Sequence, residues 1–119
     1  MDKKVENLML YKVAYELLLY LNKDVVKFYP REFKYTLGER LKNKSLDLLV
    51  ILYETNLKPV DQRQKDIENL LVILKTIEIM TKLSYDLKCV NLNKFNHLNN
   101  LIIQLRKMLY GWKRLIKEV

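Results

Sequence analysis

Lysines and arginines gather in two short stretches of this chain. Residues 27–44 hold six basic side chains against two glutamates, and residues 104–119 hold five against one, so each stretch carries a net +4. Basic and acidic residues balance elsewhere, so the two stretches account for the net charge of +8. Clustered cations on an otherwise neutral chain favour a polyanionic partner, with RNA or DNA first.

The second stretch has the spacing of a binding face. Three of its cations are seven and four residues apart and share one face of a helix with a tyrosine, while two more lie on the adjoining strip. Lysine and arginine contact phosphates, and an aromatic ring stacks on a base. The alternative is a solvated basic face with the tyrosine in packing. The predicted nucleic-acid-binding residues are Arg106, Lys107, Tyr110, Lys113, Arg114 and Lys117.

A second patch is predicted in the first stretch. Arg40 and Lys44 are four residues apart at the start of an expected helix, and Arg31 and Lys34 lie in the preceding loop. Cations at a helix N-terminus oppose its dipole, which mildly favours a functional reason over simple solvation.

No catalytic or metal-binding motif is found. Gly38 and Gly111 lie too far apart in the sequence to form a phosphate-binding loop. Cys89 and His97 are a single thiol and a single imidazole, which are too few for a metal site or a nucleophile with its base. We therefore expect no enzymatic activity and no cofactor.

The elements that carry these residues are four predicted helices. They cover about Lys3–Lys27, Thr36–Asn56, Asp61–Lys88 and a final segment that begins at Asn91 or Asn93. Pro30 and Pro59 separate the first three, and capping boxes are expected at Thr36 with Glu39 and at Asp61 with Gln64. We predict a single all-α domain over residues 1–119, an antiparallel up-down-up-down four-helix bundle.

Each helix has an apolar stripe that should face the core. Every stripe repeats at helical spacing. The expected core residues are Leu8, Tyr11, Tyr15, Leu18, Leu19 and Val26; then Leu37, Leu41, Leu48 and Leu52; then Ile67, Leu70, Leu74, Ile77 and Tyr85; and finally Leu98, Leu101, Leu105, Leu109, Trp112 and Ile116.

The first three helices also have a second apolar stripe. One small bundle has one core, so these stripes would be exposed on a monomer, and we predict a homo-oligomer that covers them. The alternative is ordinary exposed leucines. The expected subunit contacts are Met9, Val13, Leu17 and Tyr20; Leu46, Val50, Tyr53 and Leu57; and Val72, Ile79 and Leu83.

The remaining features favour a cytoplasmic protein without membrane contact. The chain has one cysteine, no apolar run of about 18 residues and no apolar signal segment near its first residue.

Two segments resemble a known family. FYPREFKYTLGERL (residues 28–41) resembles a signature in which a proline, a charged pair and Leu-Gly-x-Arg introduce the second helix. IQLRKMLYGWK (residues 103–113) resembles a Met-Leu-Gly-Gly-Trp type of ending of the fourth helix. Together they resemble the accessory variability determinant (Avd) family of diversity-generating retroelements.

The resemblance implies a function. Avd-like proteins are non-catalytic, form barrel-shaped pentamers, and bind nucleic acid and the retroelement reverse transcriptase, which supports cDNA synthesis from a template RNA during mutagenic retrohoming. Tyr110 departs from the smaller residue usual before Gly-Trp, and Arg40 is the best functional candidate among the matches. The positions that match the family are Pro30, Leu37, Gly38, Arg40, Leu109, Gly111 and Trp112.

Two alternatives stay open from the sequence. The chain also resembles a sister group of four-helix-bundle proteins, encoded in intervening sequences of bacterial large-subunit rRNA genes. It could instead be a protein-interaction module for an acidic partner.

Overall fold

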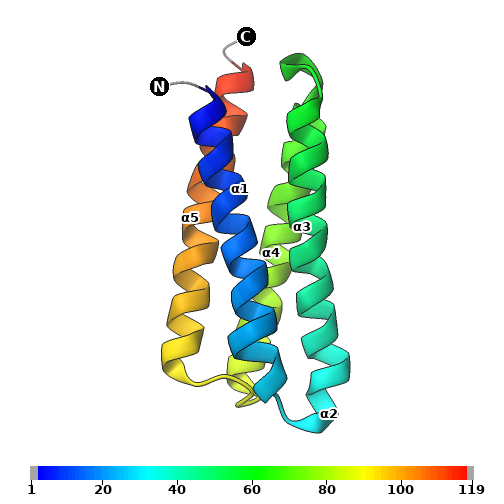
Figure 1. Ribbon diagram of the computed structural model, residues 1–119, viewed down its shortest axis with the longest axis vertical. Helices are drawn as coiled ribbons and strands as arrows, with labels where there is room; N and C mark the ends of the chain where they lie inside the picture. Colours follow the sequence, from blue (N-terminus) through cyan, green and yellow to red (C-terminus); the bar gives the residue numbers. More distant parts are fainter. Residues whose placement is uncertain (1–2, 118–119) are drawn as a thin grey trace.

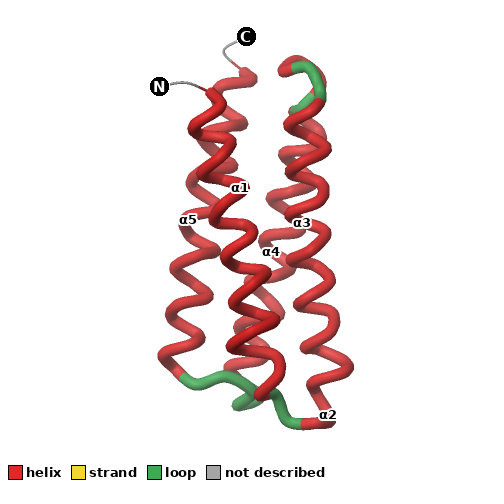
Figure 2. The backbone as a smooth tube through the Cα atoms, in the orientation of Figure 1, coloured by secondary structure: helices red, strands yellow, loops and turns green. Residues whose placement is uncertain are grey.

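Four long helices lie side by side and account for most of the chain (Figure 1). They are α1 (Lys3–Tyr20), α3 (Glu39–Leu57), α4 (Gln64–Asp86) and α5 (Leu92–Lys117). The computed structural model describes the backbone of residues 3–117 and the side chains of residues 9–116. Both α1 and α4 pack against α3 and α5, so the helices close a ring around one core, in a body of 47 × 22 × 20 Å. No strand occurs within residues 3–117 (Figure 2), and the predicted all-helical fold is confirmed.

Proline ends the first two helical segments where the sequence predicted. Tyr29 and Lys58 precede Pro30 and Pro59 and have extended backbones, with ψ of 148° and 152°. A proline ring clashes with a helical residue before it, so the helix must stop there. The first segment reaches Pro30 through a π turn, η1 (Leu21–Val25), and a 3-10 turn, η2 (Val26–Phe28).

The capping box predicted at Thr36 is wrong, because the second helical segment begins earlier. The carbonyl of Pro30 accepts hydrogen bonds from the amides of Phe33 and Lys34, both at 2.9 Å, and starts α2 (Arg31–Phe33). Thr36 lies one turn further on, inside the π turn η3 (Lys34–Gly38), and its hydroxyl donates to the Glu32 carbonyl at 3.0 Å.

The capping pair predicted at Asp61 is also wrong. Asp61 lies in the 3-10 turn η4 (Val60–Gln62), and no side chain caps the start of α4. Arg63 acts here instead, donating to the carbonyls of Lys58 at 2.8 Å and Asn56 at 2.9 Å. A cation at these carbonyls complements the negative end of the α3 dipole.

The turn between α4 and α5 is closed by backbone bonds. The Cys89 amide donates to the Ser84 carbonyl and the Lys88 amide to the Tyr85 carbonyl, while Lys88 takes a left-handed φ of 63°. This is a Schellman arrangement, with lysine where glycine is usual. Asn91 then caps α5 as predicted, since its Oδ1 accepts from the Lys94 amide at 2.9 Å.

At Gly38, the turn η2 packs against the start of the second helical segment. A Cβ at this position would lie 2.6 Å from Val26 Cγ1 and 3.3 Å from the Phe33 carbonyl oxygen. Since any side chain would collide there, glycine lets η2 and η3 approach closely.

The core contains the predicted stripe of α5 and most of those of α3 and α4. All six α5 residues are buried, as are Leu41, Leu48, Leu52, Ile67, Leu70, Leu74 and Ile77. Leu37 and Tyr85 are half-buried.

The orientation predicted for α1 is wrong. Tyr11, Tyr15 and Leu19 are exposed, and of the predicted set Val26, in η2, is buried and Leu18 is half-buried. The buried residues of α1 are Leu10, Val13, Ala14 and Leu17. α1 is apolar on several sides, so periodicity alone does not choose its core face. Burying Tyr11 and Tyr15 would desolvate two hydroxyls, whereas Val13, Ala14 and Leu17 have no polar side-chain atoms to desolvate. The side chain of Leu8 lies outside the described residues.

Candidate nucleic-acid interface

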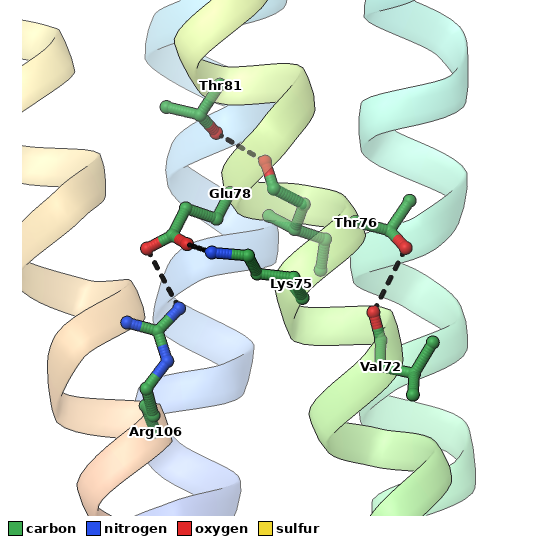
Figure 3. Close-up of polar contacts among 7 residues, drawn as sticks. Val72, Lys75, Thr76, Glu78, Thr81 and Arg106 are labelled. Carbon is green, nitrogen blue, oxygen red and sulfur yellow. Dashed lines mark hydrogen bonds and ion pairs between the residues drawn. The ribbon is translucent and has the colours of Figure 1, made fainter.

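Arg106 does not project freely into solvent, because it crosses from α5 to α4. Its Nη2 lies 2.8 Å from Oε2 of Glu78, whose Oε1 accepts from Lys75 at 2.7 Å (Figure 3). Lys75 first, and Arg106 after it, lower the pKa of the Glu78 carboxyl and keep it ionised. One carboxylate is thus shared by two cations.

Lys113, two turns after Arg106, also faces α4. Its Nζ lies 3.8 Å from Oε1 of Glu68, a long contact between partly exposed groups. The spacing of seven does place Arg106 and Lys113 on one side of α5, but that side faces the carboxylates of Glu78 and Glu68 on α4. The side chain of Lys117 lies outside the described residues.

Lys107, Tyr110 and Arg114 form what we call the outer strip of α5. All three are exposed and lie three and four residues apart, opposite the buried stripe. Neither cation has an ion-pair partner among residues 9–116. The two cations span about 10 Å of helix and flank an aromatic ring, so the strip could neutralise phosphates and stack a base.

Gly111 lies beside the outer strip and is not crowded by any of the side chains of residues 9–116. The nearest atom to a Cβ placed there is Nη2 of Arg114, at 3.9 Å. A close approach by another of the described helices therefore does not explain this glycine.

The cations of the first stretch lie at the other end of the bundle. α2 and the start of α3 are at the end opposite the last turns of α5 (Figure 1). Arg31 and Arg40 are exposed without a salt bridge within the described side chains, and Lys34 and Lys44 are half-buried. The structure does not bring the two predicted patches together.

An exposed aromatic residue extends the basic end beyond the predicted set. Phe28 is 62% exposed, and the Nζ atoms of Lys94 and Lys27 lie 4.2 and 5.1 Å from its ring centroid. Lys94 lies at the start of α5, in the part of the sequence where basic and acidic residues are equal in number. The fold therefore adds to this end of the bundle a cation that lies outside the two basic stretches. The signal for Phe28 was its place at the edge of the basic stretch.

The exposed apolar stripes of α1 and α3 meet. The Tyr11 and Tyr53 rings contact edge to face, with centroids 6.5 Å apart. Leu46, Val50 and Leu57 are also exposed on α3, as predicted, with Tyr53 at 56%. An apolar face therefore crosses from one helix to the other.

The contacts predicted on α1 need correction. Val13 and Leu17 are 5% and 0% exposed and belong to the core, so they are unavailable to a partner. Tyr20 is half-buried, with its ring 4.4 Å from that of His97 on α5. Only Met9 of this set is exposed; the surface position belongs instead to Tyr11, Tyr15 and Leu19.

Two residues of the predicted α4 stripe line separate grooves. Val72, Ile79 and Leu83 are all exposed. Ile79 lines a shallow groove towards α5 with Phe95 and Asn99, whereas Leu83 lines another towards α3 with Arg40 and Asn43.

The other candidates for chemistry are the imidazole of His97 and the thiol of Cys89. His97 packs on Tyr20, and burial raises the pKa of the buried Cys89 thiol, which disfavours its reactive thiolate. The described side chains contain no group of three or more His, Cys, Asp or Glu placed to hold a metal ion. Within the described chain, no helix combines the length and apolar character needed to cross a bilayer.

Comparisons with protein-family models, curated proteins and solved structures found no match to this chain.

Proposed function

We propose that this chain is a non-catalytic nucleic-acid-binding accessory protein, similar in role to the Avd proteins of diversity-generating retroelements. In this proposal an antiparallel up-down-up-down bundle assembles into a barrel-shaped homo-oligomer, a pentamer by resemblance. It holds template RNA or cDNA and docks the reverse transcriptase during mutagenic retrohoming. Its mechanism is scaffolding: cations neutralise and position phosphates without bond chemistry.

The outer strip of α5 carries the proposal. Lys107 and Arg114 are exposed, have no ion-pair partner in the described part of the chain and flank the exposed ring of Tyr110. Ionic contacts to phosphate release counterions, so binding should weaken steeply as salt rises. Arg106 and Lys113 are secondary, since binding there must compete with Glu78 and Glu68.

The test is a charge reversal with a matched control. Lys107→Glu with Arg114→Glu and, separately, Lys12→Glu with Lys65→Glu each change the net charge equally, and all four residues are exposed. We expect the first pair to weaken binding of a labelled single-stranded RNA of about 16 nucleotides at least tenfold, and to reduce the slope of log affinity against log salt by about 2. Anisotropy titrations at several salt concentrations measure both quantities.

The control decides what a loss means. If Lys12→Glu with Lys65→Glu weakens binding as much, the effect is one of net charge and the outer strip has no special role. If neither pair changes the affinity, the proposed interface is wrong.

The retroelement assignment and the oligomer have separate support. The assignment relies on the two sequence segments, and a reverse transcriptase gene with a repeat pair beside this gene would support it, whereas an rRNA operon would favour the sister group. The oligomer is supported by the apolar face that Tyr11 and Tyr53 connect, together with Met9, Tyr15, Leu19, Leu46, Val50 and Leu57. A face of this extent on a monomer would be unusually apolar.

A further inference from the structure

A groove of about 520 Å³ lies at the end of the bundle that holds α2, between η3 with the first turn of α3 and the last turn of α4. That volume is within the range of small-ligand sites, roughly 300–1,000 Å³. Its walls combine the aromatic ring of Tyr35, the apolar side chains of Leu83 and Leu87, the guanidinium of Arg40 and the amide of Asn43.

The backbone around the groove is irregular. Tyr35 belongs to the π turn η3, and such turns often occur at functional sites. Gly38, the last residue of this turn, packs closely on Val26 of η2. Tyr35 is thereby held at the rim of the groove and is 66% exposed.

The charge of the groove favours an anion. Arg40 is exposed and has no ion pair among the described side chains, and Lys34 Nζ lies 5.7 Å from the centroid of the Tyr35 ring. The one carboxylate of the lining, Glu39, is paired with Lys42 at 3.1 Å. One cation therefore lies beside the aromatic ring and a second lines the same groove, and neither is in an ion pair among the described side chains.

We propose that this groove binds one unstacked nucleotide of a single-stranded nucleic acid. The base stacks on Tyr35 and packs against Leu83 and Leu87, Arg40 contacts the adjacent phosphate, and the Asn43 amide reaches a base edge, because an amide both donates and accepts. A base inside a duplex has both faces covered by its neighbours, so only a single strand can insert one. The inference rests on the proposed function, which it narrows from nucleic acid in general to single strands.

This use of Leu83 removes it from the predicted subunit contacts. Leu83 lies one turn beyond Ile79 on α4, and the two residues line different grooves.

The test uses a single-stranded RNA that contains 2-aminopurine, whose fluorescence is quenched by stacking. We expect binding to quench the probe with the wild-type chain and with Tyr35→Phe, but not with Tyr35→Ala. Tyr35→Ala should weaken single-strand affinity about 5- to 150-fold and leave duplex affinity within twofold, and Tyr35→Phe should match the wild type. Circular dichroism of each variant checks the fold, which the exposed position of Tyr35 should preserve.

Three results would overturn the inference. If the chain binds no nucleic acid, this site and the proposed function both fail. If it binds RNA but Tyr35→Ala keeps the affinity and the quenching, only the nucleotide site fails, and the groove is left for a peptide. An equal loss for single strands and duplexes would mean that Tyr35 contacts the backbone and does not stack on a base.

Discussion

The two glycines of the chain provide an internally controlled test of the packing. Gly38 and Gly111 both have helical backbones, so alanine at either position adds one methyl group and raises helix propensity. Their surroundings are opposite: the Cβ of residue 38 would meet the core, and the Cβ of residue 111 would meet open space among the described side chains. We expect Gly38→Ala and Gly111→Ala to change stability in opposite directions.

The magnitude follows from the distances. A Cβ at position 38 would lie 2.6 Å from Val26 Cγ1, and Val26 is a stiff β-branched residue with 1% exposure, so it cannot turn away. Overpacking costs about 1–3 kcal/mol, and the gain in helix propensity returns about 1 kcal/mol. At such a short distance we expect a net loss of about 1–2 kcal/mol. For Gly111→Ala the nearest atom is 3.9 Å away, so a gain of about 0.5–1 kcal/mol remains.

Urea unfolding followed by far-ultraviolet circular dichroism measures both changes. With a slope of about 1–3 kcal/mol per molar urea, the midpoint should fall by about 0.5–1 M in Gly38→Ala and rise by a few tenths molar in Gly111→Ala. The titration is repeated at two protein concentrations, because self-association would make the midpoint depend on concentration.

Each variant has a result that refutes the reasoning. If Gly38→Ala is as stable as the wild type, the contact between η2 and η3 is not rigid and the glycine is not needed for packing. If Gly111→Ala loses stability at every concentration, the space beside Gly111 is not open. A loss confined to high concentration would mean that a second subunit occupies it.

Three further outcomes are expected. Burial raises the pKa of Tyr29 to about 12, compared with about 10 when unfolded, so ionisation of the phenol opposes folding and the protein should lose stability as the pH rises from 10 towards 12. Thermal unfolding of Tyr29→Phe should depend less on pH in that window, and an unchanged profile would contradict the shift. Arg63→Ala removes the two hydrogen bonds at the end of α3 and the contact with the Trp112 ring, whose centroid is 5.5 Å away. The free energy of unfolding in urea should therefore fall by about 1–3 kcal/mol, and a fall below about 0.5 kcal/mol would show that the cap is dispensable. Val50→Glu with Tyr53→Glu places two carboxylates on the α1–α3 face and should convert an oligomer to the monomer in sedimentation. The control pair on the polar face of α5, Asn100→Glu with Gln104→Glu, should leave the oligomer intact. Equal behaviour of the two pairs, or a monomeric wild type, would rule out the α1–α3 face as an interface.

The sequence predicted burial and helix boundaries most reliably where the residue pattern is compatible with only one arrangement. α5 has one apolar and one polar face, so all six residues predicted for its stripe are buried and only Ile102 was missed, and Pro30 and Pro59 fixed two boundaries by sterics. α1 lacks such a contrast, because its tyrosines are amphipathic and Ala14 adds little to an apolar pattern. Only the packed bundle shows that Ala14 is fully buried.

The candidate interface was harder to predict because it depends on contacts between helices. The spacing of Arg106 and Lys113 did place them on one side of α5, but their neighbours Glu78 and Glu68 are 28 and 45 positions earlier in the sequence. The capping box at Thr36 failed for a local reason, since the Pro30 carbonyl starts the second segment before Thr36 is reached. The groove at Tyr35 depends on a π turn, which leaves no recognised mark on the spacing of apolar residues.

The carboxylates of Glu68 and Glu78 partly neutralise one side of α5. Three cations share these two carboxylates, so that side keeps a net charge of +1, whereas both cations of the outer strip stay unpaired among the described side chains. The electrostatic potential is therefore uneven around the axis of α5, and an anion that approaches this helix is attracted more strongly to the outer strip than to the side that faces α4.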